Sequence, residues 1–230
     1  MNAGDLRSAR RAKGWSQVEA ARRLGVSQPY LAMLERGQRR LTPALVKRAV
    51  GAYDAPATAV PLPPPHAPRY QPTAAILAKD LAGLGYPGFA YLRSPSWKPK
   101  NPGEVLLAAL ACDDLESRLV EALPWLVLRY HALDWTWVMR EAKVHDLQNR
   151  LGFVVSLARR LAERAHDRAA RTLARLEGDL ERSRLAREDT LCRASLTEPE
   201  RRWLAKHRSK DARHWSLLTD WTAEALRYIA

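Results

Sequence analysis

Residues 14–37 have the sequence GWSQVEAARRLGVSQPYLAMLERG, and this stretch decides the fold of the first part of the chain. Ser16 followed three residues later by Glu19 is typical of a capping box, which closes the start of a helix by reciprocal side-chain hydrogen bonds. A helix should therefore begin at Gln17. Residues three and four positions apart give this helix one apolar face: Ala20, Ala21 and Leu24.

A second short helix is predicted directly after Gly25, which supplies the turn that permits a steep crossing. Ser27 caps this helix, and Pro29 is tolerated because the first helical turn has no use for its amide hydrogens. Leu31 and Leu34 face inward, whereas the exposed start of the helix is polar. The pattern thus predicts two short helices packed at an angle.

This layout resembles the Xre, Cro and phage-repressor class of helix-turn-helix domains over residues 4 to about 50. The matching residues follow the order of that family: Leu6-Arg7, Ala9-Arg10, Trp15-Ser16-Gln17, Ala21, Leu24-Gly25-Val26-Ser27, Leu34-Glu35-Arg36-Gly37 and Thr42-Pro43. The resemblance implies that Gln17 braces the phosphate backbone of DNA and that Gln28 reaches adenine in the major groove. A neutral amide suits the adenine edge because it donates and accepts at once.

The predicted partner of this domain is double-stranded operator DNA. Arginines that follow the second helix would lie near phosphates, where they add affinity without sequence information. The predicted DNA-binding residues are Gln17, Ser27, Gln28, Tyr30, Arg36, Arg39 and Arg40. The alternative is that these are merely solvated polar residues on a small helical domain.

Positive charge is concentrated in the same segment. The 230 residues carry a net charge of +13. Residues 1–50 hold eleven Lys and Arg against three Asp and Glu, residues 51–133 hold seven of each, and residues 134–230 hold twenty against fifteen. An excess next to the motif is expected if phosphate neutralisation and counterion release drive binding.

Composition also argues against several other classes of protein. No stretch of about 18 uncharged apolar residues exists and the N-terminus lacks a signal-peptide core, so we expect a cytoplasmic protein without a membrane partner. Cys112 and Cys192 are too few and too far apart to form a metal site, and reduced thiols are the ordinary state in the cytosol. We expect neither a metal nor a cofactor.

The sequence predicts an all-α protein with an N-terminal helix-turn-helix bundle (residues 1–54), a Pro-rich linker (55–72) and a C-terminal irregular helical bundle with a long helix (73–230). Residues 55–72 contain seven prolines, a density that favours an extended, fairly stiff spacer. The third segment is expected to mediate dimerisation and partner binding. A homodimer is expected because two DNA half-sites about 34 Å apart require a two-fold partner.

Helices in the C-terminal segment are predicted from apolar spacing. They cover residues 74–82, 102–109, a stretch capped by Asp113-Asp114 that ends near Tyr130, a long amphipathic stretch from about 134 to 180, a helix capped by Thr197, and a last one with Trp215, Leu218, Trp221 and Leu226. The long stretch has coiled-coil character in one or two segments, and its apolar stripe from Val144 to Leu180 is the predicted dimer seam. Its arginines 164, 168, 171 and 175 interleave with acidic residues, which is typical of a solvated face, with nucleic-acid contact as the alternative.

Seven of the eight tryptophans lie outside the first domain. Such side chains are either core residues, the default, or anchors in an interface. The predicted partner-binding anchors are Trp97, Trp125, Trp135 and Trp137. Residues 122–130, 134–135 and 142–153 resemble the C-terminal domain of bacterial regulators found beside nucleotidyltransferase toxins of the abortive-infection type. That resemblance implies the antitoxin and autorepressor of a toxin-antitoxin operon, with a cognate toxin protein as a partner.

Two other functions remain open. A stand-alone regulator would sense a small ligand or peptide through the aromatic-rich bundle. A ribonuclease is the enzymatic rival, because Arg140 with His145 and Arg160 with His166 match the loose spacing of HEPN ribonucleases. Such spacing arises readily by chance in an arginine-rich chain, so we predict no catalytic residue and expect a protein that is not an enzyme.

Overall fold

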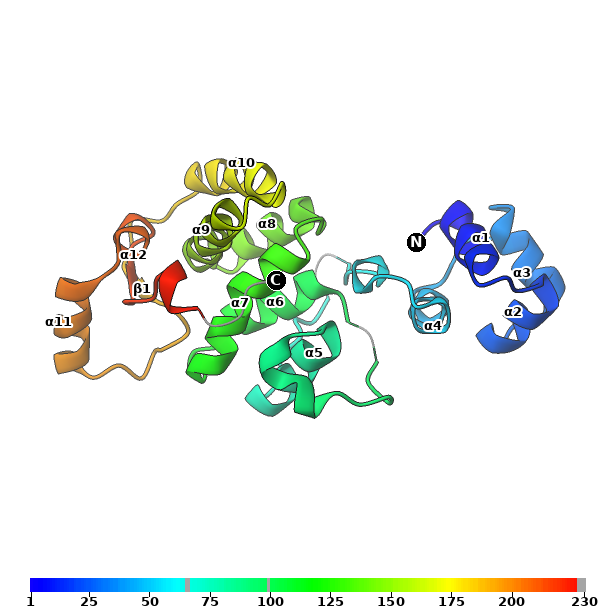
Figure 1. Ribbon diagram of the computed structural model, residues 1–230, viewed down its shortest axis with the longest axis horizontal. Coiled ribbons are helices and arrows are strands. Elements are labelled where there is room, and N and C mark those ends of the chain that lie inside the picture. Colours follow the sequence, from blue (N-terminus) through cyan, green and yellow to red (C-terminus); the bar gives the residue numbers. More distant parts are fainter. Residues whose placement is uncertain (65–66, 99, 227–230) are drawn as a thin grey trace. The chain divides into compact units, whose positions relative to one another are not determined.

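The protein is mostly helical, as the computed structural model in Figure 1 shows. The structure describes residues 1–64, 67–98 and 100–226. The chain divides into two compact units, one of Met1–Ala67 with Ser96–Asn101 and one of Pro68–Pro95 with Pro102–Ala230. Within the described residues, no helix combines the length and the apolar composition needed to cross a bilayer.

The first unit is built on four helices, α1 (Ala3–Ala12), α2 (Gln17–Leu24), α3 (Gln28–Glu35) and α4 (Pro43–Tyr53). Each begins at a residue whose side-chain oxygen accepts a hydrogen bond from a backbone amide of the first turn: Asn2, Ser16, Ser27 and Thr42. Gly25 ends α2 with a φ of 62°, a left-handed conformation that suits glycine. Leucines 6, 24, 31 and 34 are fully buried and form the centre of the core.

The predicted start of the linker belongs to this unit. Residues Ala57–Ala59 form a short 3₁₀ helix, η1, and Val60 is buried against Val46 and Val50 of α4. The side-chain amide of Asn101 donates to the carbonyl of Val60 at 2.7 Å. The prediction of an extended spacer from residue 55 onward is therefore wrong for residues 57–60, because Val60 packs into an apolar cluster with Val46 and Val50.

The second unit packs its helices around α9 (Gln148–Arg164), in which every residue from Leu151 to Ala158 is buried. Four helices precede α9: α5 (Ala74–Leu84), α6 (Pro102–Leu110), α7 (Ser117–Arg129) and α8 (Trp135–Val144), with a 3₁₀ segment, η2 (Pro87–Leu92), after α5. The helices that follow it are α10 (Ala169–Glu181), α11 (Glu198–His207), α12 (Lys210–His214) and the 3₁₀ helix η3 (Ala223–Ala225). Figure 1 shows α9 between α10 and α7, both of which contact it.

A close contact in this core fixes where the C-terminal segment lies. A side chain on Gly152 would place its Cβ 2.4 Å from the ring of Trp215, which is fully buried. The indole nitrogen of Trp215 donates to Ser156 Oγ at 2.8 Å, and that hydroxyl donates to Glu177 Oε1 at 2.6 Å. One turn of α9 thus joins α10 to the segment after α12.

The predicted long helix is in fact three helices, α8, α9 and α10. Asp146 and His166 adopt left-handed conformations with φ of 56° and 52°. The amides that follow them bond back five residues, Leu147 to Ala142 and Asp167 to Ala162, each at 2.8 Å. These are helix-terminating bonds that a repeat of apolar residues does not reveal.

This division removes the predicted dimer seam. The stripe from Val144 to Leu180 is mostly buried within the unit, because α9 and α10 pack against each other, and Leu161, Leu173 and Leu180 are all buried. At its first position, Val144 is exposed. The prediction that this stripe pairs two copies of the chain is therefore wrong.

Two further boundaries differ from the prediction. Asp114 does not cap α7, which begins at Ser117, but accepts hydrogen bonds from the amide and hydroxyl of Ser195 at 3.0 and 2.7 Å. The predicted last helix is a short strand instead. The strand β2 (Leu217–Leu218) pairs in parallel with β1 (Asp189–Thr190), and Ser216 before it has a φ of 55° that ends the helical path.

Candidate nucleic-acid interface

The candidate interface is the exposed side of α2 and α3, two short helices joined by three residues. Gly25 and the cap residue Ser27 bracket this turn, so that α3 starts at Gln28 directly after it. The inward sides of both helices are leucine and alanine, which fixes their packing through apolar burial. The sequence therefore sets which residues of α3 face outward.

Four side chains form one hydrogen-bonded chain that ends at the start of α3. Arg10 of α1 donates to both carboxylate oxygens of Glu35, from Nε at 2.6 Å and from Nη2 at 3.0 Å. Glu35 Oε2 also accepts from Gln17 Nε2 at 2.9 Å, and Gln17 Oε1 accepts from Gln28 Nε2 at 2.9 Å. The chain links three helices of the domain and holds both glutamine amides in fixed orientations.

The ion pair at the base of this chain is well buried. The side chain of Glu35 is 2 % exposed and that of Arg10 is 11 % exposed. Burial alone would raise the pKa of Glu35, but hydrogen bonds from Arg10 and Gln17 outweigh it and the pKa is lowered. The hydrogen bond to Glu35 raises the pKa of Arg10. Both groups are therefore charged at neutral pH.

Gln28 keeps polar capacity for a partner. Only one of its amide hydrogens is used, so Oε1 and the second hydrogen have no partner among the described residues. One acceptor and one donor on a fixed amide are what the N7 and N6 edge of adenine requires. Gln17 has both ends of its amide engaged within the protein and holds the Gln28 amide, and its contact with the phosphate backbone stays a prediction.

The other predicted contacts are less constrained. Ser27 Oγ caps α3 by accepting from the Tyr30 amide at 3.4 Å, and Tyr30 packs part of its ring on the core. Arg36 is exposed and donates from Nε to the carbonyl of Ala32 at 3.1 Å. Arg39 and Arg40 are exposed and have no ion pair within the described part of the chain. Their contact with DNA stays a prediction.

Comparison with known families gives one result for this chain. Residues 6–59 match the family model described as helix-turn-helix. The N-terminal region is a helix-turn-helix domain of the Xre and Cro type. A domain of this type suggests a DNA-binding transcriptional regulator. Comparison with curated proteins and with solved structures gave no match.

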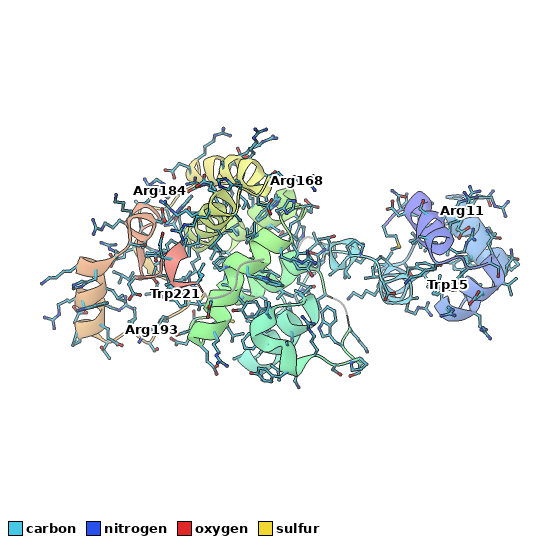
Figure 2. All side chains as sticks on the ribbon, in the orientation of Figure 1. Arg11, Trp15, Arg168, Arg184, Arg193 and Trp221 are labelled. Atoms are coloured by element: carbon cyan, nitrogen blue, oxygen red, sulfur yellow. The ribbon has the colours of Figure 1, made fainter. Side chains whose placement is uncertain are left out.

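Sequence reasoning missed two features of the helix-turn-helix domain. The role of Glu35 as acceptor for both Arg10 and Gln17 was not predicted, although a carboxylate on the inward side of α3 signals a buried cationic partner. Trp15, seen in Figure 2, lies with its ring 4.1 Å from the guanidinium carbon of Arg23, a cation–π contact at the start of α2. The capping box was only half right, because Ser16 accepts from the Glu19 amide while the Glu19 carboxylate pairs with Arg23.

The predicted partner anchors, of which Trp97 lies in the first unit and the other three in the second, separate into two groups. Trp125 and Trp135 are buried, with exposed fractions of 4 % and 9 %, and belong to the core of the unit. The prediction that these two residues anchor a partner is therefore wrong, because their side chains are buried within the unit. Trp97 and Trp137 are half-buried, and for them the expectation stays a prediction. Trp203, which was not among the predicted anchors, is 51 % exposed and stacks on His207.

The two arginine and histidine pairs of the nuclease hypothesis do not meet. His145 precedes α9 and His166 follows it, and a helix of 17 residues is about 25 Å long. Arg160 is held by both carboxylate oxygens of Asp211 at 2.6 Å, and Arg140 pairs with Glu141 at 3.1 Å. The structure described here therefore does not bring the two pairs together into one site.

Proposed function

We propose that this protein is a sequence-specific transcriptional repressor that reads operator DNA through Gln28. The observation that carries the proposal is the hydrogen-bonded chain from Arg10 through Glu35 and Gln17 to Gln28. It fixes the Gln28 amide before DNA arrives, which lowers the conformational entropy lost on binding. Positive charge on the same domain supplies the affinity for phosphates that carries no sequence information.

The test compares two kinds of variant on operator and random DNA. Gln28→Ala should lower specific affinity by about 1 to 3 kcal/mol and leave salt-driven binding to random DNA nearly intact. Arg39→Gln with Arg40→Gln should weaken binding to both and reduce the dependence on salt. Equal losses on both DNAs for Gln28→Ala would refute its role as a base-reading residue.

For the biological role, we propose that the repressor is the antitoxin and autoregulator of a toxin-antitoxin operon. The support is the resemblance of residues 122–130, 134–135 and 142–153 to regulators of that type, together with the half-buried Trp97 and Trp137. The full chain should then co-purify with the product of the adjacent gene and relieve its inhibition of growth. A neighbour that is harmless alone, or whose toxicity this protein does not change, contradicts the proposal.

We also propose that the repressor acts as a homodimer held by its second unit, since one domain of this type on one half-site binds weakly. Sedimentation of the full chain and of a fragment ending at Pro72 tests this. A dimeric full chain and a monomeric fragment are expected. A stably dimeric fragment would place the contact in the first unit instead.

A ligand-sensing regulator is a second candidate function, and a cleft in the second unit favours it. The cleft has a volume of about 490 Å³ and is lined by residues of η2, α7 and the C-terminal segment, among them Tyr86, Arg118, Glu121, Asp220 and Trp221. That volume suits a small ligand, and both signs of charge beside two aromatic rings suit a zwitterion. A ligand that shifts the thermal unfolding of the chain and changes operator affinity would favour this function over the antitoxin role.

We propose that the protein has no enzymatic activity. The enzymatic rival predicts RNA cleavage that is lost in His145→Ala or His166→Ala. Incubation of the wild-type chain with RNA should give no cleavage that these variants abolish.

A further inference from the structure

One side of α10 carries three exposed arginines that the DNA-binding domain does not explain. Arg168, Arg171 and Arg175 are spaced three and four residues apart, so they lie on one stripe of the helix. The buried side of α10 is formed by Leu173, Leu176 and Leu180. Arg168 stands at the start of α10, where Figure 2 labels it.

The acidic residues around this stripe are engaged elsewhere. Asp167 accepts from the Ala169 amide at 2.8 Å. Glu177 accepts from Ser156 and Arg159, and Asp179 pairs with Arg182. Glu181 pairs with Arg184 and His214.

Within the described residues, arginines 168, 171 and 175 consequently have no carboxylate partner. The nearby carboxylate of Asp167, which accepts from a backbone amide, offsets part of this charge, and the stripe stays net positive.

The position of these charges on the helix is unfavourable for the isolated protein. The N-terminal end of a helix carries a partial positive charge, so cations there are destabilising and acids are favoured. The first turn of α10 has no acidic residue, and Arg168 and Arg171 both stand in it or directly before it, where the carboxylate of Asp167 offsets only part of their charge. An anionic partner would reduce this repulsion further.

We propose that this arginine stripe is a second DNA contact, which binds the phosphate backbone of the duplex beside the operator. The inference rests on the proposed function, because the helix-turn-helix domain brings duplex DNA to the same chain and raises its effective concentration near α10. Arginine suits phosphate because its planar guanidinium donates two parallel hydrogen bonds. Arg168 and Arg175 are seven residues apart, about 10 Å along the helix, which matches about three base pairs of duplex.

The experiment compares two triple variants of the full chain that lose the same charge. The test variant is Arg168→Gln, Arg171→Gln and Arg175→Gln. The control is Arg140→Gln, Arg193→Gln and Arg202→Gln, three exposed arginines of the same unit that are paired with acids. Glutamine keeps helix propensity close to that of arginine, and circular dichroism checks that each variant is folded.

Affinity is measured on two duplexes over a range of salt concentrations. One duplex contains the operator alone, and the other extends it by about 20 base pairs, roughly two helical turns, on each side. On the extended duplex the test variant should bind about 10-fold or more weakly at low salt, with a salt slope smaller by roughly 2 to 3. On the short duplex both variants should bind like the wild type.

Several outcomes would overturn the inference without touching the proposed function. Equal losses for test and control variants would mean that only net charge matters. A test variant that matches the wild type on the extended duplex would show that the stripe does not contact DNA. A loss of binding to single-stranded RNA, or to a co-purified acidic protein, with duplex binding unchanged would assign the stripe to that partner. A wild-type chain that binds operator and random DNA equally well would instead contradict the proposed function.

Discussion

The two units of this chain reach their folds by different routes. In the helix-turn-helix domain, cap residues and a left-handed glycine set each helix from within a few residues, and one buried ion pair ties them together. In the second unit, groups distant in sequence determine the packing. Arg150, for example, binds both carboxylate oxygens of Asp189, 39 residues away, and the carbonyl of Leu110. Residues close in sequence thus determine the helices of the first unit, whereas contacts between distant residues determine the packing of the second.

The largest expected effect is on the second unit alone. Gly152→Ala would drive a methyl group into the ring of Trp215, and overpacking of this kind should cost about 3 kcal/mol. Thermal unfolding should then show the second unit melting earlier while the helix-turn-helix transition stays in place. If both units melt together at a lower temperature, they are coupled and the comparison fails.

The next effect is on the first unit. Glu35→Gln removes the charge that Arg10 pairs with and should cost about 2 kcal/mol, since a mostly buried cation loses its charged hydrogen-bond acceptor. The matched control is Glu19→Gln, which removes an exposed pair with Arg23 and should change stability by less than about 0.5 kcal/mol. Chemical denaturation followed by Trp15 fluorescence in a fragment of residues 1–67 measures both.

The same ion pair predicts a pH dependence. The pKa of Glu35 is lowered from its ordinary value of 4.5, so the native state favours the carboxylate. Its contribution to stability is complete above pH 4.5 and is lost as the pH falls through the native pKa. Glu35→Gln should flatten this part of the stability profile. An unchanged acid limb would contradict the assigned pairing.

A smaller effect tests the local specification of α2. Ser16→Ala removes the acceptor for the Glu19 amide and should cost about 1 kcal/mol in the first unit. The second unit should not respond, because its helices begin at cap residues of their own, such as Thr73 of α5 and Ser209 of α12.

The smallest effect has the opposite sign. Gly178→Ala in α10 meets open space and should stabilise the second unit by about 0.5 to 1 kcal/mol, because alanine loses less backbone entropy in a helix. It is the matched control for Gly152→Ala. A loss of stability at position 178 would mean that α10 is packed differently from the described structure.

What could be predicted from the sequence follows the same division. The cap residues Ser16 and Ser27, the turn at Gly25 and the apolar faces of α2 and α3 are local signals, and the structure has them as predicted. The ends of α8 and α9 could not be predicted, because Asp146 and His166 adopt left-handed conformations without a glycine to mark them. The burial of Trp125 depends on neighbours such as Tyr86, which are far away in the sequence.

For the candidate site, the residues were predictable but their connections were not. Gln17 and Gln28 were identified from the motif, whereas the link from Gln17 to Glu35 spans 18 residues and required the packing of α2 on α3. The arginine stripe on α10 was visible as a charge run. Only the partners of the surrounding acids show that three of its arginines have no ion pair among the described residues.

A double-mutant cycle at Gln17 and Gln28 tests the central claim that recognition depends on the hydrogen-bonded chain. The affinity of the full chain for its operator is measured for Gln17→Ala, Gln28→Ala and the double variant. Because Gln17 positions Gln28, the double variant should lose about 1 kcal/mol less than the sum of the single losses. Strictly additive losses would mean that the two glutamines act independently, and would contradict the claim.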